Sequence, residues 1–400
     1  MQSKKICLIT TGHISSNPRL IKEATSLSNA GFEVHIVFTQ YVEHLVIEDL
    51  KILSSHSNWT YDQLLWTPIN MLLRFKTAVF QRIARSIYPV IRFRELIINR
   101  NYAWQLKAAR KVKADLYIAH NLGALPVAVN AAKKNQVKCG FDAEDFHRNE
   151  VSGDPNSFDV RLKKHIEDKY LKEIDYFTAA SPLISKAYKD LYPDLNPILI
   201  NNVFEIKHQP RLNANINSKL KLFWFSQTIG KGRGLEDVFQ AINLIKNPLI
   251  ELHLLGNLSI DDQEYFNNLA HFDIQYHQPI SGNEIFDLAA TFDIGLALER
   301  NTPLNRDICL TNKIFTYLMS GLAIISSNTQ AQQKFMEENP NIGKIYPIGN
   351  VNALADIIVD YFNDRTLLNH YKKNAFHLAK SKYNWEMEQE KFLAIIKTVI

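Results

Sequence analysis

One stretch near the end of the chain, residues 307–327, constrains the possible folds more than any other. Its sequence, DICLTNKIFTYLMSGLAIISS, predicts a loop, a helix over 313–320 and a buried strand over 323–326 in immediate succession. Apolar residues fall on one face of the expected helix, and Gly321 is placed to end it. A helix that leads directly into an apolar strand is typical of an α/β domain.

The start of this expected helix is also a candidate anion site. Thr311 and Asn312 are favourable residues for a helix N-terminus, and Lys313 follows them. The free backbone N–H groups, the partial positive charge of the helix end and the Lys313 ammonium together suit a phosphate or a diphosphate. An ordinary helix with a surface lysine would show the same pattern, so the rest of the chain must decide.

The chain opens with a strand, a helix and a second strand. Residues 6–10 and 34–38 predict the strands, and the helix between them begins near Arg19 and ends at Gly31. Such a crossover implies a parallel sheet that binds ligands at the carboxyl ends of its strands. In the loop TGHISSNP, the single Gly12 permits close backbone approach, although the dinucleotide fingerprint is absent.

Polar residues near the ends of these strands are candidate ligand contacts. His13 and Asn17 lie in the first loop, and His120 ends a strand predicted over 115–120. Asn17 stands before Pro18, so it could equally serve as a turn and helix cap.

Titratable residues follow the strand predicted over 137–141. They are Asp142, Glu144, Asp145 and His147. Carboxylates and a histidine at this place suit a general base or a site that orients a hydroxyl group, and their proximity pushes the pKa of at least one carboxyl upward. Capping of the next helix is the alternative.

The second half of the chain restarts the pattern around a glycine-rich loop. A strand over 220–225 and a helix over 235–245 flank residues 226–234, SQTIGKGRG. Three glycines together with Lys231 and Arg233 predict an anion-binding loop with cationic side chains. The spacing is not that of a Walker motif, so the pattern does not identify the ligand.

The length of 400 residues suits two domains, each with its own core. The polar, aperiodic residues 207–219 are the expected linker. Cys7, Cys139 and Cys309 lie in or beside apolar runs without a C-x-x-C spacing, which favours small buried thiols in a reducing compartment. The apolar runs are too short for a signal peptide or a membrane span, so we expect a cytoplasmic protein, either soluble or peripheral at the inner face of the cytoplasmic membrane.

Basic residues are concentrated in residues 71–113. This segment has eleven Lys and Arg against the single acid Glu95, although the formal charge of the whole chain is only +5. Aromatic residues are interspersed in the amphipathic helices that we expect over residues 61–110, and this combination predicts adsorption to an anionic membrane surface. Helices packed on the sheet with solvated arginines are the alternative. No nucleic-acid partner is expected, because the remainder is acidic and lacks a recognised binding motif.

Eight segments carry a resemblance that covers nearly the whole chain. They are TGHISSNPRLIKEA (11–24), DLYIAHN (115–121), FDAEDFHRNE (141–150), INNVFE (200–205), SQTIGKGRGLEDVF (226–239), LHLLGN (252–257), TNKIFTYLMSGLAIISS (311–327) and YNWE (383–386). In their order and spacing they resemble the retaining nucleotide-sugar glycosyltransferases of family four, which have the GT-B fold.

The resemblance implies an α/β protein with two Rossmann-like parallel-sheet domains that face each other across a cleft, and a C-terminal helix that returns to the N-domain. Residues 1–206 with about 380–400 would form the acceptor-binding domain, and 207–379 the nucleotide-sugar-binding domain. The implied activity is that of a hexosyl- or related glycosyltransferase of polysaccharide biosynthesis. It would move a sugar, with retention, from a nucleotide diphosphate sugar to a hydroxyl of a lipid-linked or anionic surface glycan. No metal or other cofactor is expected.

The resemblance also assigns roles to individual residues. Arg233 with Gly234 matches the family's Lys-Gly pair on the donor diphosphate, whereas the accompanying arginine falls on Gln227 and is offset by Lys231. The donor set is completed by Thr311, Asn312, Lys313 and Thr316. The catalytic candidates are Glu144, Asp142 and His147, with no choice among them, and the acceptor side comprises Gly12, His13, Asn17 and His120.

Two positions depart from the family's pattern. The family's E-x7-E pair falls on Ile308 and Thr316, and a threonine offers one hydrogen bond to a ribose where a carboxylate offers two. Two alternatives therefore stay open, a nucleotide-sugar epimerase of the same fold and a catalytically inactive GT-B scaffold or partner subunit.

Overall fold

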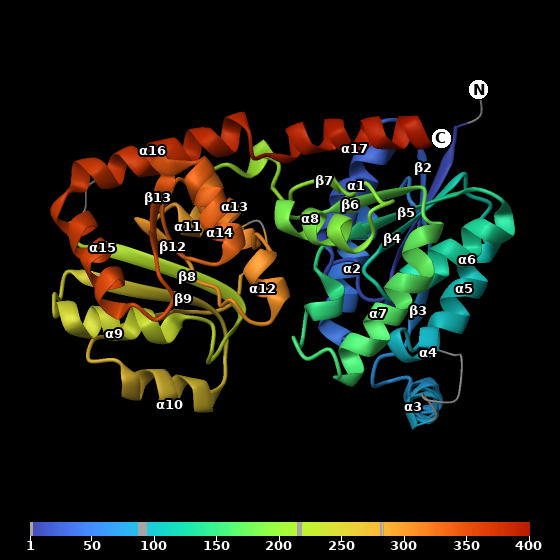
Figure 1. Cartoon of the computed structure of the whole chain (residues 1–400), viewed down its shortest axis with the longest axis horizontal. Helices are drawn as coiled ribbons and strands as arrows, with labels where there is room; N and C mark the ends of the chain where they lie inside the picture. Colours follow the sequence, from blue (N-terminus) through green and yellow to red (C-terminus); the bar gives the residue numbers. More distant parts are fainter. Residues whose placement is uncertain (1–2, 87–93, 214–217, 281, 283) are drawn as a thin grey trace. The chain divides into compact units, whose positions relative to one another are not determined.

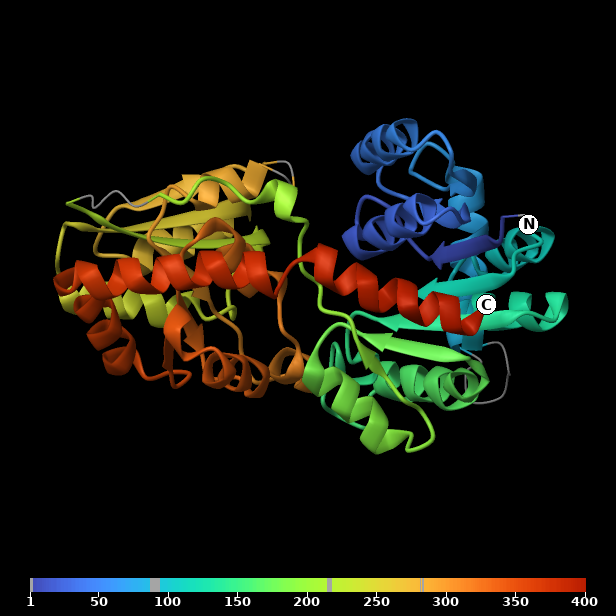
Figure 2. The ribbon, with the colours of Figure 1, turned by 90° about the horizontal axis from the view of Figure 1, so that it is seen from above.

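The computed structural model describes residues 3–86, 94–213, 218–280, 282 and 284–400. The chain divides into two compact units, of which unit 1 comprises Met1–Asn201 with Gln389–Ile400 and unit 2 comprises Asn202–Glu388 (Figure 1). Each unit is built on an all-parallel sheet with helices on both faces (Figures 1 and 2). The predicted α/β class with two Rossmann-like domains is confirmed. The domain boundaries predicted at 206/207 and 379/380 stay predictions.

The sheet of unit 1 has the order β3-β2-β1-β4-β5-β6-β7. Its strands are β1 (Lys5–Thr10), β2 (Glu33–Gln40), β3 (Thr60–Leu65), β4 (Leu116–His120), β5 (Lys138–Ala143), β6 (Tyr176–Ala179) and β7 (Ile198–Leu199). The central strands are buried along nearly their whole length, which explains their continuous apolar runs.

The helices of unit 1 cover this sheet. They are α1 (Pro18–Asn29), α2 (Glu43–Ser55), α3 (Met71–Ser86), α4 (Arg94–Ile98), α5 (Tyr102–Lys111), α6 (Leu125–Asn135), α7 (Phe158–Tyr170) and α8 (Pro182–Leu191). The last helix, α17 (Trp385–Val399), contributes its residues from Gln389 onward to unit 1, and Ser26 donates a hydrogen bond of 3.1 Å to Gln389. The predicted return of the final helix to the N-terminal domain is thereby confirmed.

The sheet of unit 2 has the order β10-β9-β8-β11-β12-β13. Its strands are β8 (Leu220–Ile229), β9 (Ile250–Leu258), β10 (Ile274–His277), β11 (Ile294–Ala297), β12 (Ala323–Ser327) and β13 (Gly343–Tyr346). Its helices are α9 (Leu235–Ile245), α10 (Ile260–Leu269), α11 (Glu284–Ala289), α12 (Leu304–Ile308), α13 (Asn312–Ser320), α14 (Gln330–Glu338), α15 (Val351–Asn363) and α16 (Arg365–Ser381). Gly321 ends α13 with φ +69°, as the sequence predicted.

Two expected elements differ in the structure. Residues 60–65 form the strand β3 at the sheet edge, where the sequence suggested the start of a helical region. The first half of the expected glycine-rich loop is strand, because β8 continues through an irregular register to Ile229. Gly256 of β9 permits this, since a Cβ at its position would lie 2.3 Å from the Ser226 carbonyl oxygen.

The structure also bears on two further expectations, the burial of the cysteines and the lack of a membrane-spanning segment. The prediction of buried thiols is confirmed for Cys7 and Cys139, whereas Cys309 is partly exposed. None of the helices in the described ranges combines the length and apolar character that crossing a membrane requires.

Candidate functional site

A cluster of charged side chains is buried in unit 1 at the carboxyl ends of β4 and β5. Arg19 and Glu23 come from α1, His120 ends β4 and Asp142 lies in β5, and all four side chains are 0% exposed. The Arg19 guanidinium donates to both oxygens of Asp142, at 2.5 Å from Nε and 2.7 Å from the second nitrogen. Thr178 of β6 donates to Asp142 at 2.6 Å. The cluster therefore joins α1 to neighbouring strands of the sheet.

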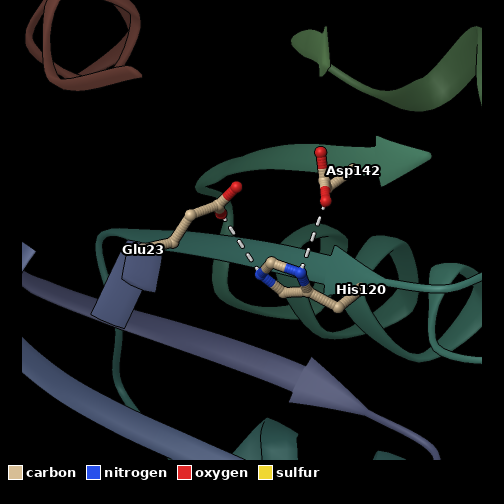
Figure 3. Close-up of side chains that lie close together, drawn as sticks. All are labelled: Glu23, His120 and Asp142. Carbon is tan, nitrogen blue, oxygen red and sulfur yellow. Dashed lines mark ion pairs between the residues drawn. The ribbon is translucent and has the colours of Figure 1, made fainter. Parts of the chain in front are cut away.

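His120 lies between the two carboxyl groups of this cluster (Figure 3). Its Nε2 is 3.2 Å from Glu23 and its Nδ1 is 3.6 Å from Asp142. Burial alone would lower the pKa of His120, but the nearby carboxyl groups of Glu23 and Asp142 outweigh it and raise this pKa to about 10. Burial would likewise raise the pKa of Asp142, but Arg19 and His120 outweigh it and hold this pKa below the usual range.

Glu23, His120 and Asp142 could also be considered as a metal site. Their ligand atoms lie within 4.8 Å of one another, and among the described residues this is the group that has such an arrangement. Arg19, however, is bidentate to Asp142 and its Nε is 3.7 Å from Glu23. A cation would have to compete with this guanidinium, so the cluster fits a structural ion network better than a metal site.

Glu144 stands one residue beyond β5 and is the most available of the catalytic candidates. It is partly exposed, in contrast to the buried Asp142. Burial, followed by the negative charge of Asp142, raises the pKa of Glu144 to about 7. At neutral pH this carboxyl group can therefore both accept and release a proton, as a general base requires.

His147 begins a short 3-10 turn, His147–Asn149, and is 5% exposed. Its backbone N–H donates to the Tyr188 hydroxyl at 3.2 Å, and its Nδ1 lies 3.7 Å from Glu150. Its ring packs near Phe141, with 5.9 Å between the centroids. The structure thus buries His147 in the packing of unit 1, whereas Glu144 is partly exposed to solvent.

The loop between β1 and α1 contains three of the acceptor candidates. His13 Nδ1 is 2.6 Å from the Asp49 carboxylate, and its Nε2 accepts the backbone N–H groups of Tyr41 and Val42 at 2.9 Å each. Because Nε2 accepts, the proton lies on Nδ1 and both nitrogens are engaged. Asn17 accepts the Leu20 N–H at 3.0 Å as the cap of α1, which is the alternative that its sequence position left open.

Gly12 and His120, the other two acceptor candidates, differ in their exposure to solvent. A Cβ added at Gly12 would meet the Tyr41 ring at 3.6 Å, an ordinary contact, so the protein's own packing does not require a glycine there. His120 is 0% exposed and contacts Glu23 and Asp142. Of the predicted acceptor residues, Gly12 alone is partly exposed, because His13, Asn17 and His120 are buried.

Unit 2 has an open group of charges around the loop between β8 and α9. Gly232 and Gly234 have φ angles of +70° and +85°, and a Cβ at Gly234 would lie 3.1 Å from Leu298. Arg233 donates to the Ser226 hydroxyl at 2.9 Å, and Lys231 lies over the Tyr265 ring at 4.3 Å. The two predicted cations thus stand on a loop whose backbone only glycines adopt readily.

The backbone of this loop is not an empty anion site. The Gly232 N–H donates to the Glu236 carboxylate at 2.7 Å, where the sequence predicted a donor for a ligand anion. Arg300, which follows β11, lies 3.6 Å from Glu236, and Arg306 of α12 donates to the Gly232 carbonyl oxygen at 3.5 Å. Arg300 and Arg306 add two cations that the motifs did not identify.

Lys313 of α13 points toward the end of β11. Its Nζ is 2.8 Å from the Glu299 carboxylate and lies 5.8 Å from the centre of the Trp224 ring. The Glu299 N–H donates to the Ser327 hydroxyl at 2.9 Å, and that hydroxyl donates to the Glu299 carbonyl oxygen at 2.8 Å. Ser327 of β12 therefore fixes the backbone of Glu299, and Glu299 in turn positions Lys313.

The other donor candidates are distributed unevenly. Thr316 is 1% exposed and leaves almost no surface for a ribose, whereas Asn312 and Gln227 are exposed. Thr311 caps α13 without a side-chain bond to the helix, and its hydroxyl is buried without a partner among the described residues. The carboxylate that contacts Lys313 of α13 is Glu299. Counting back from Gly321 with the family's E-x7-E spacing reaches Thr316 and Ile308 and so misses Glu299, which precedes α12.

No protein-family model and no curated protein matches the sequence. Solved structures do match along the whole chain. HepE from Anabaena, in complex with UDP and glucose, has a TM-score of 0.70 at 14% identity and covers 99% of this chain and 100% of its own. The sucrose-phosphate synthase from Thermosynechococcus elongatus also has a TM-score of 0.70 at 14% identity, with 99% and 98% covered.

A third similar structure is a putative UDP-N-acetylglucosamine 2-epimerase from Listeria monocytogenes. Its TM-score is 0.63 at 12% identity, and it covers 100% of this chain and 96% of its own. At such identities the likeness is one of fold. It shows that the chain has the two-domain GT-B fold of these proteins.

Proposed function

We propose that the protein is a glycosyltransferase that moves a sugar from a nucleotide diphosphate sugar to an acceptor hydroxyl. The observation that carries the proposal is the cationic site of unit 2, defined as Arg233, Arg300 and Arg306 around the loop between β8 and α9 and Lys313 beside Glu299 after β11. The site lies at the carboxyl ends of β8 and β11, where parallel α/β sheets bind ligands. The GT-B fold, in which HepE binds UDP-glucose, supports the same function.

In this proposal the cationic site holds the diphosphate of the donor. Arg233 and Lys313 contact the phosphate oxygens, together with the N-terminal N–H groups of α13. As the bond between the sugar and the phosphate breaks, negative charge grows on the departing diphosphate, and the fixed cations stabilise it. Such charge stabilisation does not itself require a metal. We assign the ribose contact to Glu299, since Thr316 is buried.

Glu144 is the residue that we propose for proton transfer in unit 1. Its raised pKa and its partial exposure support this role, while Asp142 is held by Arg19 and acts as a positioning residue. We further propose retention of configuration and a hexosyl donor, on the strength of the sequence motifs. The acceptor would be a lipid-linked or anionic surface glycan at the cytoplasmic face of a membrane.

The test is the release of nucleoside diphosphate from a panel of UDP-, GDP- and ADP-sugars, with and without oligosaccharide acceptors. We expect one nucleotide class to bind and to be consumed faster when an acceptor is present. Binding of no nucleotide, measured by calorimetry, would contradict the proposal. Product anomeric configuration by NMR then decides between retention and inversion.

Two other functions have specific support and separate outcomes in the same experiment. The Listeria structure favours an epimerase. An epimerase would convert one nucleotide sugar into its epimer without any acceptor and without net release of nucleoside diphosphate. The absence of a carboxylate at Ile308 and Thr316 favours an inactive scaffold, which would neither transfer nor hydrolyse.

A further inference from the structure

We propose that the exposed face of α3 is a binding surface for an anionic lipid bilayer. The inference extends the membrane location suggested by the proposed function, but the binding itself does not depend on sugar transfer. Figures 1 and 2 show α3 at the periphery of unit 1.

An apolar stripe runs along α3 and is open to solvent. The exposed apolar side chains of the helix and of its entry are Ile69, Met71, Phe75, Val79, Phe80 and Ile83. Met71, Phe75, Val79 and Ile83 follow one another at intervals of four residues and so fall on one side of the helix. Phe75 is 71% exposed and Met71 is 76% exposed, which is uncommon for large apolar side chains in one patch.

The opposite side of α3 is packed, so the exposed stripe has a fixed direction. Ala84 is buried in a small cluster with Ile97 of α4 and Leu162 of α7. Gln81 donates to the Ile97 carbonyl oxygen at 2.9 Å. The helix is therefore anchored on unit 1 through one side, and the apolar stripe faces outward as a consequence.

The charges on the exposed side all have one sign. Lys76, Arg82 and Arg85 are exposed, and none of the residues 71–86 is acidic. An amphipathic helix with large apolar side chains and interspersed Lys and Arg suits the boundary between lipid head groups and acyl chains. The basic side chains extend to the lipid phosphates while the apolar ones enter the bilayer surface.

This distribution fits a lipid surface better than a protein partner. The cores of protein interfaces are depleted in lysine, whereas here Lys76 stands among the apolar residues. A second copy of the chain on this face would bring equal positive charges together across a twofold axis. An anionic bilayer satisfies both the apolar stripe and the charge.

The structure narrows the surface that the sequence placed over 71–113. Arg100 stacks on Trp66 at 4.7 Å and donates to Thr77 at 2.7 Å, and Arg94 contacts His165, so these two cations serve the packing of unit 1. Arg92 lies outside the described residues. Lys107, Arg110, Lys111 and Lys113 are exposed, but among the described residues of 71–113 every exposed large apolar side chain lies on α3. The surface is therefore assigned to residues 69–85 of α3 and its entry.

Vesicle flotation with the full-length protein and no donor tests the assignment. Vesicles of phosphatidylcholine alone are compared with vesicles that contain one quarter phosphatidylglycerol, at low and high salt. We expect binding to the anionic vesicles that weakens with salt. Lys76→Gln/Arg82→Gln should bind about 25-fold more weakly, at about fivefold for each lost charge. Phe75→Gln/Phe80→Gln should also reduce binding at least tenfold.

Matched controls sit on unit 2. Ile260 is 83% exposed on α10 and Lys373 is exposed on α16, so Ile260→Gln and Lys373→Gln should bind vesicles as the wild type does. Circular dichroism confirms that each variant is folded. Equal binding to neutral and anionic vesicles, no binding, or loss of binding in the controls would overturn the proposal. A concentration-dependent dimer that Phe75→Gln abolishes would overturn it in favour of a second copy. Each of these outcomes leaves the transfer assay unaffected.

Discussion

The two units place charges at the carboxyl ends of parallel strands in opposite ways. In unit 1, the side chains of Arg19 and Asp142 are 0% exposed, and each charge has an internal partner. In unit 2, the side chains of Lys313 and Glu299 are 11% and 13% exposed, and Glu299 follows the end of β11. The same position in the same type of sheet thus carries a fully closed network in one unit and a pair that keeps some contact with water in the other.

The difference teaches which charges can take part in binding. A charge with no contact to water can leave its partner only at a large cost, so Arg19 and Asp142 hold α1 on the sheet rather than bind a ligand. The pair Lys313 and Glu299 is largely buried but keeps some contact with water, so it can exchange partners when an incoming phosphate compensates the loss. Burial therefore separates structural from binding charges better than residue type does.

The largest expected effect comes from breaking the closed network. Arg19→Met leaves Asp142 buried without its bidentate partner, and we expect it to lower the free energy of unfolding by about 3–5 kcal/mol. Urea denaturation followed by circular dichroism measures this. Arg19→Met/Asp142→Leu removes both charges and should be less destabilised than the single variant.

An exposed ion pair gives the baseline for that measurement. Lys186 and Asp190 lie 2.5 Å apart with side chains 67% and 60% exposed, so Lys186→Ala should change stability by less than about 0.5 kcal/mol. If Arg19→Met proved as mild as Lys186→Ala, the distinction between the two kinds of charge would fail.

A smaller effect, on binding instead of stability, is expected in unit 2. Lys313→Gln removes one charged hydrogen-bond donor to the proposed diphosphate, which corresponds to about 1.5–3 kcal/mol, or roughly 10- to 100-fold in affinity. Isothermal titration with the nucleoside diphosphate that the wild type binds measures the loss. Unaltered affinity, or a stability loss as large as that of Arg19→Met, would place Lys313 among the structural charges.

Much of the fold could be predicted from the sequence because local patterns specify it. The boundaries of α9 agree with the prediction, and those of α13 agree to within one residue, since an apolar stripe, a cap and a terminal glycine or left-handed residue mark their ends. The continuation of β8 was missed because it depends on Gly256 in a neighbouring strand. Such an effect of one strand on another is not visible in local sequence.

The candidate sites were predicted less completely, for a similar reason. Lys313 and Arg233 stand in motifs and were found, but their partners Glu299 and Ser226 come from other strands. The closed network of unit 1 joins residues more than a hundred positions apart, as Arg19 and Asp142 show. Residue type predicted a reactive Asp142, and only its burial identifies it as a positioning residue.

Glu144 is intermediate between the buried structural charges of unit 1 and the binding charges of unit 2. Its substitution is expected to have the smallest effect on stability or binding. It adjoins the closed network but is partly exposed, and its pKa is raised from 4.5 to about 7. Because the folded pKa exceeds the unfolded one, the contribution of Glu144 to stability is complete below pH 4.5 and is lost as the pH rises through about 7. The difference between these pKa values corresponds to at most about 3 kcal/mol, which the partial exposure of Glu144 reduces to about 1–2 kcal/mol. Glu144→Gln cannot ionise, so it should avoid this loss.

The same titration should govern catalysis in the opposite direction. If Glu144 accepts the proton of the acceptor hydroxyl, the transfer rate rises with pH to a plateau above about pH 7, and Glu144→Gln abolishes this rise without weakening nucleotide binding. Initial rates and urea midpoints measured from pH 4.5 to 8.5 on both proteins separate the two effects. If Glu144→Gln changes the stability but not the pH dependence of the transfer rate, Glu144 has a structural role, like the buried charges of Arg19 and Asp142. A rate profile that changes together with stability would place it with the binding charges.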